Sequence, residues 1–183
     1  MNKILVFLLG FCLSIFANSE LLKVANSGDF LAKNAKSWNC VLDTKNNLLW
    51  EVKTASGLQN SQNTYTWFDE KSGVENGEYS QNCSWKKSCN TQNFIKALNK
   101  NQLCQASNWH LPTAKELDLL LIYNDDNPLI NTDFFPNTQP QLYWSADEID
   151  ADVAIATPFL YGGTRSNEKS FDFYLRGVAN VAK

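Results

Sequence analysis

The segment from Cys83 to Cys89 carries the side chains best suited to contact a ligand, namely Trp85, Lys86 and Lys87. An indole ring beside two ammonium groups can stack on a sugar ring and pair with a sulfate or carboxylate. Cysteines at both ends would anchor the loop, so little conformational entropy would be lost on binding. The simpler interpretation is a solvated loop with Trp85 folded onto the surface. These three residues are the first ligand-binding candidates.

A loop near the C-terminus supplies a second set of candidates, Tyr161, Arg165 and Lys169. They surround Gly162 and Gly163, and they again combine an aromatic ring with two cations. Loops that join regular elements carry binding residues more often than the elements themselves. We therefore treat this loop as a second, weaker candidate for ligand contact.

His110 is the single histidine of the chain, which limits the catalytic mechanisms that the sequence could support. A Ser/His/Asp or Cys/His arrangement would have to use it as the base. It stands between Trp109 and Leu111, where a structural or surface role is the simpler interpretation. No pair of carboxylates is marked out as an acid and base couple. The sequence therefore predicts no catalytic activity.

The sequence also gives little support for a metal site. The cysteines form no C-x-x-C pair and have one histidine to accompany them, which disagrees with the ligand spacings of zinc sites. The stretch 124–127 and Asp133 could offer oxygen atoms to calcium, but an Asx-rich turn after a helix is the simpler interpretation. We expect no metal and no cofactor.

The N-terminus has the form of a secretory signal peptide. Lys3 precedes an apolar run from Ile4 to Phe16, and Ala17 is a small residue suited to cleavage. We divide the chain into a signal peptide at 1–17, a polar leader at 18–37 and one domain at 38–183. We expect export to the periplasm, the cell surface or the medium.

Charge and hydropathy exclude two classes of partner. The 183-residue chain has a formal net charge of −3 and no run of clustered Lys and Arg, which argues against nucleic-acid binding. After the signal peptide, no stretch is apolar enough to predict a membrane span. The oligomeric state does not follow from the sequence.

An even number of cysteines remains after signal cleavage, in an oxidising compartment, so two disulfides are expected. The four cysteines are Cys40, Cys83, Cys89 and Cys104. We favour Cys89 with Cys104, because a helix of about ten residues fits between them, and this leaves Cys40 with Cys83. The alternative closes the small ring from Cys83 to Cys89.

Two helices are predicted from caps and apolar spacing. Asn90 or Thr91 can cap a helix that ends by about Lys100, with an apolar face of Phe94, Ile95 and Leu98. Thr113 and Glu116 stand in the spacing of a capping box, and Pro112 requires an extended residue before it. This second helix should bury Leu117, Leu120 and Leu121 and end before Asn124.

Strands are predicted on both sides of the helices. The apolar pair Val41–Leu42 and the run 48–52 flank a polar turn and predict a β-hairpin. Further candidates are 143–145, 153–156 and the alternating run 171–178. These elements predict an α+β domain with two helices, small antiparallel sheets and long loops. Trp50, Trp67, Trp109 and Trp144 are expected in its core.

The order of short motifs resembles the Legionella collagen-like protein C-terminal domain family, a bacterial domain of unknown function. The resemblance runs from about Trp38 to Val178 and rests on WNCVLD at 38–43, LLWEVK at 48–53, YTW at 65–67, WHLPT at 109–113, FFPN at 134–137, YWS at 143–145 and YLR at 174–176. His110 stands where the family usually has arginine, and the chain has no collagen-like Gly-x-y tract.

The LPTAKE segment at 111–116 is also similar to a piece of formylglycine-generating enzymes, which implies a C-type-lectin-like fold. Their oxidase chemistry is not implied, because those enzymes use a late cysteine pair and this chain has no cysteine after Cys104. The family resemblance implies an exported, non-catalytic binding module, an adhesin that recognises a glycan, which could be sulfated. The alternative is an envelope structural or assembly protein whose partner is a protein of the envelope or of a host. An unrecognised envelope enzyme is the least favoured alternative.

Overall fold

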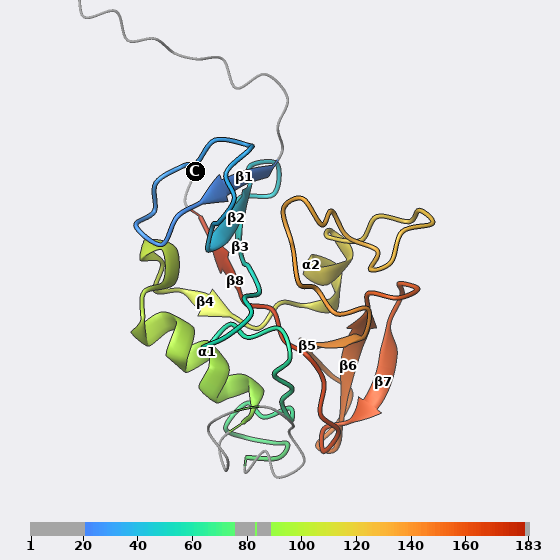
Figure 1. Ribbon diagram of the computed structural model, residues 1–183. Coiled ribbons are helices and arrows are strands. Elements are labelled where there is room, and N and C mark those ends of the chain that lie inside the picture. The colour runs from blue at the N-terminus through green and yellow to red at the C-terminus, as the bar shows by residue number, and fades with distance from the viewer. Residues whose placement is uncertain (1–20, 76–82, 84–88, 182–183) are drawn as a thin grey trace, which may run out of the picture.

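Two antiparallel sheets and two helices form a mixed α+β fold in the computed structural model, which describes residues 21–75, 83 and 89–181 (Figure 1). The first sheet has the order β1-β2-β3-β8-β4 and the second the order β5-β6-β7. The strands are β1 Leu21–Val24, β2 Cys40–Asp43, β3 Leu48–Glu51, β4 Trp109–His110, β5 Leu142–Glu148, β6 Val153–Pro158, β7 Arg165–Glu168 and β8 Val178–Asn180. The helices are α1 Thr91–Lys100, the 3-10 turn η1 Leu103–Gln105, and α2 Ala114–Asp118.

The predicted hairpin is confirmed as β2 and β3, which pair from Cys40 opposite Glu51 to Asp43 opposite Leu48. The Asp43 carboxylate accepts hydrogen bonds from the backbone N–H groups of Lys45 and Asn46, both at 3.0 Å, and so fixes the turn. In front of the hairpin, β1 pairs with β2. The segment 18–37, expected to be a polar leader, therefore contributes an edge strand to the first sheet.

Both faces of the first sheet are covered. Leu49 and Ala179 point to a core shared with α1, while the neighbouring Trp50 and Val178 point to a second core shared with α2. Successive residues of a strand face opposite sides, so a strand with two covered faces is buried at every position. β3 is buried at all four of its residues.

The four tryptophans expected in the core are buried, with exposed fractions between 0% and 3%. Their indole N–H groups are placed by backbone carbonyls in three cases: Trp67 donates to Ser145 at 2.8 Å, Trp144 to Tyr65 at 2.9 Å and Trp109 to Leu103 at 3.1 Å. The bonds of Trp67 and Trp144 tie segments that are 78 and 79 positions apart in the sequence.

The caps of both helices are confirmed. The Asn90 side chain accepts from the N–H of Asn93 at 2.8 Å at the start of α1. Thr113 and Glu116 form the full capping box of α2, and the Glu116 carboxylate accepts from the Thr113 N–H at 2.8 Å. α2 is shorter than predicted, because the N–H groups of residues 119–121 bond to carbonyls three positions back and form tighter turns.

The predicted strand at 171–178 is wrong for most of its length. Phe173 makes a single bridge to Tyr65, and Tyr174 makes a single bridge to Tyr143 of the second sheet. The segment thus passes from one partner to another, and only Val178–Asn180 forms a regular strand. The alternation of apolar residues correctly indicated that Leu175 is buried. It could not show that successive residues of this segment pair with different parts of the backbone.

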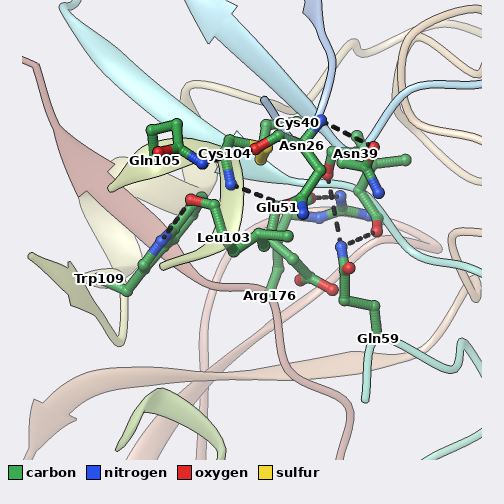
Figure 2. The surroundings of a disulfide bond; sticks show 11 residues. Asn26, Asn39, Cys40, Glu51, Gln59, Leu103, Cys104, Gln105, Trp109 and Arg176 are labelled. Atoms are coloured by element: carbon green, nitrogen blue, oxygen red, sulfur yellow. Dashed lines mark hydrogen bonds between the residues drawn. A yellow bond between two sulfur atoms is a disulfide. The ribbon is translucent and has the colours of Figure 1, made fainter. Parts of the chain in front are cut away.

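The favoured disulfide pairing is wrong, and the alternative small ring is confirmed. The disulfides join Cys40 to Cys104 and Cys83 to Cys89. After α1 the Gln102 N–H donates to the Asn99 carbonyl at 3.1 Å and the Gln105 N–H to the Gln102 carbonyl at 2.8 Å, so tight turns follow the helix and the chain does not run back along it to Cys89. The chain instead brings Cys104 to the first sheet, where its N–H donates to the Asn26 side chain at 3.1 Å (Figure 2).

A cluster of buried charges lies at the end of β3. Glu51, Lys53 and Arg176 are each exposed by 3% or less. The Lys53 ammonium lies 3.0 Å from the Glu51 carboxylate, and the Arg176 guanidinium donates to the Glu51 backbone carbonyl at 2.6 Å (Figure 2). Burial lowers the pKa of Lys53, and the nearby Glu51 acts in the opposite direction. These groups join β3 to the segment before β8.

Candidate ligand-binding surface

The first set of candidates lies outside the described part of the chain. Trp85, Lys86 and Lys87 fall within 84–88, whereas the cysteines that flank them are described. Cys89 is buried, Cys83 is half-buried, and the Cys89 carbonyl accepts from the N–H of Thr66 at 3.1 Å. The signal peptide at 1–17 also falls outside the residues that the structure describes.

Lys169 is separated from the other two members of the second set. Its ammonium is buried and donates to Ser72 Oγ, Glu148 Oε2 and the Asp150 carbonyl, each at 2.8 Å. The same nitrogen lies 4.2 Å from the centre of the Trp67 ring. Its three N–H donors are therefore all used within the chain, which gives Lys169 a structural role.

Tyr161 and Arg165 do lie together. The guanidinium carbon of Arg165, the first residue of β7, is 5.0 Å from the centre of the Tyr161 ring. Between them Gly162 and Gly163 have φ values of +71° and +74°, a conformation that favours glycine and reverses the chain tightly. The N–H of Gly162 donates to the Pro158 carbonyl at 2.9 Å, which anchors the turn to the end of β6.

A third residue, Tyr123, joins this pair from a distant part of the sequence. A Cβ atom added to Gly162 would lie 2.4 Å from Tyr123 Cε1, so the tyrosine ring rests on the glycine backbone. The Tyr123 hydroxyl donates to the Asp118 carboxylate at 3.2 Å. Two backbone bonds bring the segments together: Ile122 to Leu129 at 3.0 Å and Leu129 to Phe159 at 2.8 Å.

We call Tyr123, Tyr161 and Arg165 the aromatic platform. Tyr123 is 65% exposed and Tyr161 is 53% exposed, so both rings are open to solvent although their backbones are anchored. Three exposed aliphatic side chains neighbour the two tyrosines in the sequence, namely Leu119, Ile122 and Leu160. No local signal around Tyr123 indicated this role, because its neighbour Gly162 is 39 positions away in the chain.

The residues around His110 serve the fold. Trp109 is buried, Pro112 precedes the cap, and Thr113 and Glu116 form the capping box. The His110 imidazole makes polar contacts with the Asn108 carbonyl at 3.3 Å and the Glu116 carboxylate at 3.5 Å. Neither group is a nucleophile of the hydroxyl or thiol type that a histidine base would activate.

Among the residues that the structure describes, no group of three or more His, Cys, Asp or Glu side chains could hold a metal ion. Over the same part of the chain, no helix has both the length and the apolar character required to cross a membrane.

The order of elements and motifs agrees with a known domain family. The family model of the Lcl C-terminal domain matches residues 39–179. The chain belongs to this family. The Lcl C-terminal match begins at β2 and ends in β8, so it covers both disulfides and the aromatic platform, while β1 lies in front of it. No curated protein sequence matches the chain. The two disulfides of this Lcl C-terminal domain indicate an oxidising compartment outside the cytosol.

Proposed function

We propose that this Lcl C-terminal domain is an exported, non-catalytic binding module that recognises a glycan through the aromatic platform. One observation carries the proposal: two tyrosines with more than half of their surface exposed flank an anchored glycine turn beside an arginine. Single exposed aromatic residues are common, but two that meet at one turn beside a cation are typical of a ligand surface.

The platform has the chemistry that a sugar requires. The ring faces of Tyr123 and Tyr161 can cover the C–H face of a pyranose, and their hydroxyls can bond to its hydroxyl groups. The Arg165 guanidinium can pair in bidentate fashion with a carboxylate or sulfate on the sugar. Because the Gly162 turn and the Tyr123 hydroxyl are already held by hydrogen bonds, binding would order few additional groups.

Export supports the same proposal. A signal peptide at 1–17 would deliver the domain to the periplasm, the cell surface or the medium, where glycans and the oxidising conditions for two disulfides are found together. The expected role is adhesion or glycan recognition. We propose no cofactor.

A second candidate function is assembly with a protein of the envelope or of a host. It is favoured by the exposed aliphatic side chains beside the tyrosines, with Leu119 at 47%, Ile122 at 42% and Leu160 at 44% exposure. Exposed apolar residues bordered by polar ones are typical of protein interfaces.

The proposal is tested by binding the oxidised mature domain to an array of sulfated, acidic and neutral glycans at low and high salt. We expect binding that Tyr161→Ala weakens about tenfold, the size of a lost ring stack. Arg165→Ala should weaken binding and reduce its salt dependence. Phe30→Ala and Lys100→Ala remove an exposed aromatic ring and an exposed cation elsewhere, and both should leave binding unchanged.

A blank array would contradict glycan recognition. The assembly function would take its place if the array is blank and the domain captures an envelope protein. That capture should be lost in Ile122→Ser and Leu160→Ser. Glycan binding that survives both Tyr161→Ala and Arg165→Ala would remove the platform from the proposal.

A further inference from the structure

A second candidate site is a cavity beside β1, the edge strand of the first sheet, and part of its wall precedes the family match. The cavity has a volume of about 380 Å³ and lies between β1, the stretch 33–38 and the stretch 132–134. Its wall includes three lysines, an aspartate and two aromatic rings: Lys23, Lys33, Lys36, Asp133, Trp38 and Phe134.

Lys23 is an unusual wall residue because it is only 6% exposed. Its ammonium donates to the Ala35 carbonyl at 3.1 Å and lies 3.4 Å from the centre of a Trp38 ring. Trp38 is fixed in turn, since its indole N–H donates to the Phe134 carbonyl at 2.9 Å. An ammonium has three N–H donors, and the bond to Ala35 is the one hydrogen bond that the Lys23 ammonium makes among the residues described, so donors remain for a ligand.

The other charges of the cavity act on Lys23. Burial lowers the pKa of Lys23, Lys36 lowers it further, and Asp133 raises it. Lys33 and Lys36 are exposed and able to turn toward a ligand. Three lysines and one aspartate give the cavity wall a formal charge of +2, within a domain whose whole chain carries −3. The cavity is therefore a local site of attraction for an anion.

We propose that this cavity binds the protonated phosphate group of inorganic phosphate or of a phosphate monoester. Lys23, Lys33 and Lys36 donate to the phosphate oxygens, while the Asp133 carboxylate accepts the remaining P–OH proton. Sulfate carries no such proton near neutral pH, so Asp133 repels it. The site shares no residue with the aromatic platform and does not depend on glycan recognition.

Calorimetric titration of the mature, oxidised protein with sodium phosphate tests the proposal, with sodium sulfate at equal ionic strength as the comparison. At about pH 6 a phosphate monoester is half protonated, which supplies the donor for Asp133. We expect phosphate to bind at least about tenfold more tightly than sulfate. Lys33→Ala/Lys36→Ala should weaken phosphate binding by a similar factor, whereas Lys100→Ala/Lys115→Ala removes the same charge from exposed helix positions and should not.

Asp133→Asn separates the two parts of the proposal. It replaces the negative carboxylate by a neutral amide that can donate an N–H as well as accept, so sulfate should gain affinity and the preference for phosphate should shrink. Equal binding of phosphate and sulfate by the unchanged protein would overturn the role of Asp133. Absence of heat with either anion, or full phosphate binding by Lys33→Ala/Lys36→Ala, would overturn the site.

Vesicles identify the source of the phosphate. The ligand would be a lipid monoester if the protein sediments with vesicles that contain phosphatidic acid but not with vesicles of phosphatidylcholine alone. This sedimentation should be lost in Lys33→Ala/Lys36→Ala. Phosphate binding without sedimentation would assign a soluble phosphate.

Discussion

The buried charges at the end of β3 depend on one another. Glu51 is fully buried, its carboxylate lies 3.0 Å from the Lys53 ammonium, and it also accepts from the Gly177 N–H at 3.3 Å. Lys53→Met removes the cation that faces the carboxylate, and Arg176, the other buried cation, donates instead to the Glu51 backbone carbonyl. We expect the free energy of unfolding to fall by about 3–5 kcal/mol, measured by urea unfolding followed by circular dichroism.

The matched control is Glu51→Gln/Lys53→Met, which removes both charges and keeps an acceptor for Gly177. The double variant leaves no carboxylate in the core without its facing ammonium, and Arg176 keeps its bonds to the backbone carbonyl of residue 51 and to the Thr138 hydroxyl, so it should recover part of the stability that the single variant loses. A double variant as unstable as Lys53→Met would show that packing of the Lys53 chain against Phe94, whose ring centre lies 4.7 Å from the ammonium, is the larger effect.

At the scale of elements, the features that depend on residues close together in the sequence are predicted best. The Asn90 cap and the box of Thr113 and Glu116 each involve residues three positions apart, so the spacing in the sequence is also the geometry in the structure. The end of α2 was predicted less well. Leu117 and Leu120 are both buried. Their spacing of three positions fits a tighter turn as well as an α-helix, so it does not show where α2 ends.

The two disulfides should contribute differently to stability. Cys40 and Cys104 are 64 positions apart and join β2 to η1, whereas Cys83 and Cys89 are 6 positions apart. A longer closed loop removes more conformational entropy from the unfolded chain. We expect Cys40→Ala/Cys104→Ala to cost about 4 kcal/mol and Cys83→Ala/Cys89→Ala about 2 kcal/mol, measured by thermal and urea unfolding.

Equal losses for the two double variants would contradict this order and would point to strain or packing in the folded state. The variant Cys40→Ala/Cys104→Ala can fail to fold, because Cys40 and Cys104 are both buried in the core that contains α1. Unfolding of the unmodified protein before and after mild reduction supplies the same comparison without substitutions, since Cys83 is half-buried and Cys40 is fully buried.

At the scale of the whole molecule, the binding surfaces combine residues that the sequence keeps apart. Tyr161 and Arg165 are predictable as a pair because they share a turn, but Tyr123 is brought to them across the fold, by the backbone bonds of Leu129 and by its contact with Gly162. The same holds for Lys23, which meets Asp133 across the fold. Lys169, close to Arg165 in the sequence, lies beyond the other end of the four-residue strand β7 and faces Glu148.

The core also predicts how the whole domain responds to alkaline pH. Tyr143 is buried between Phe159 and Tyr174, with ring centres 4.8 Å and 5.6 Å away, and its hydroxyl accepts from the Gln139 N–H at 2.9 Å. Burial raises the pKa of Tyr143 to about 12. An unfolded tyrosine titrates near pH 10, so above that value the unfolded state loses its proton first.

The stability that Tyr143 contributes is therefore complete below about pH 10 and is lost as the pH rises toward 12, at about 1.4 kcal/mol for each pH unit. Burial also raises the pKa of Tyr65, which adds to the loss, whereas the lowered pKa of Lys53 acts in the opposite direction below about pH 10.5. Urea unfolding at pH 8 and pH 11 measures the sum. Tyr143→Phe isolates the contribution of this tyrosine. The variant should lose about 1.4 kcal/mol less free energy of unfolding between pH 8 and pH 11 than the unmodified protein does. It is also less stable at pH 8, because the Gln139 N–H loses its acceptor. An equal loss in both proteins would mean that Tyr143 titrates as freely in the folded domain as in the unfolded chain, and that the core around it admits water.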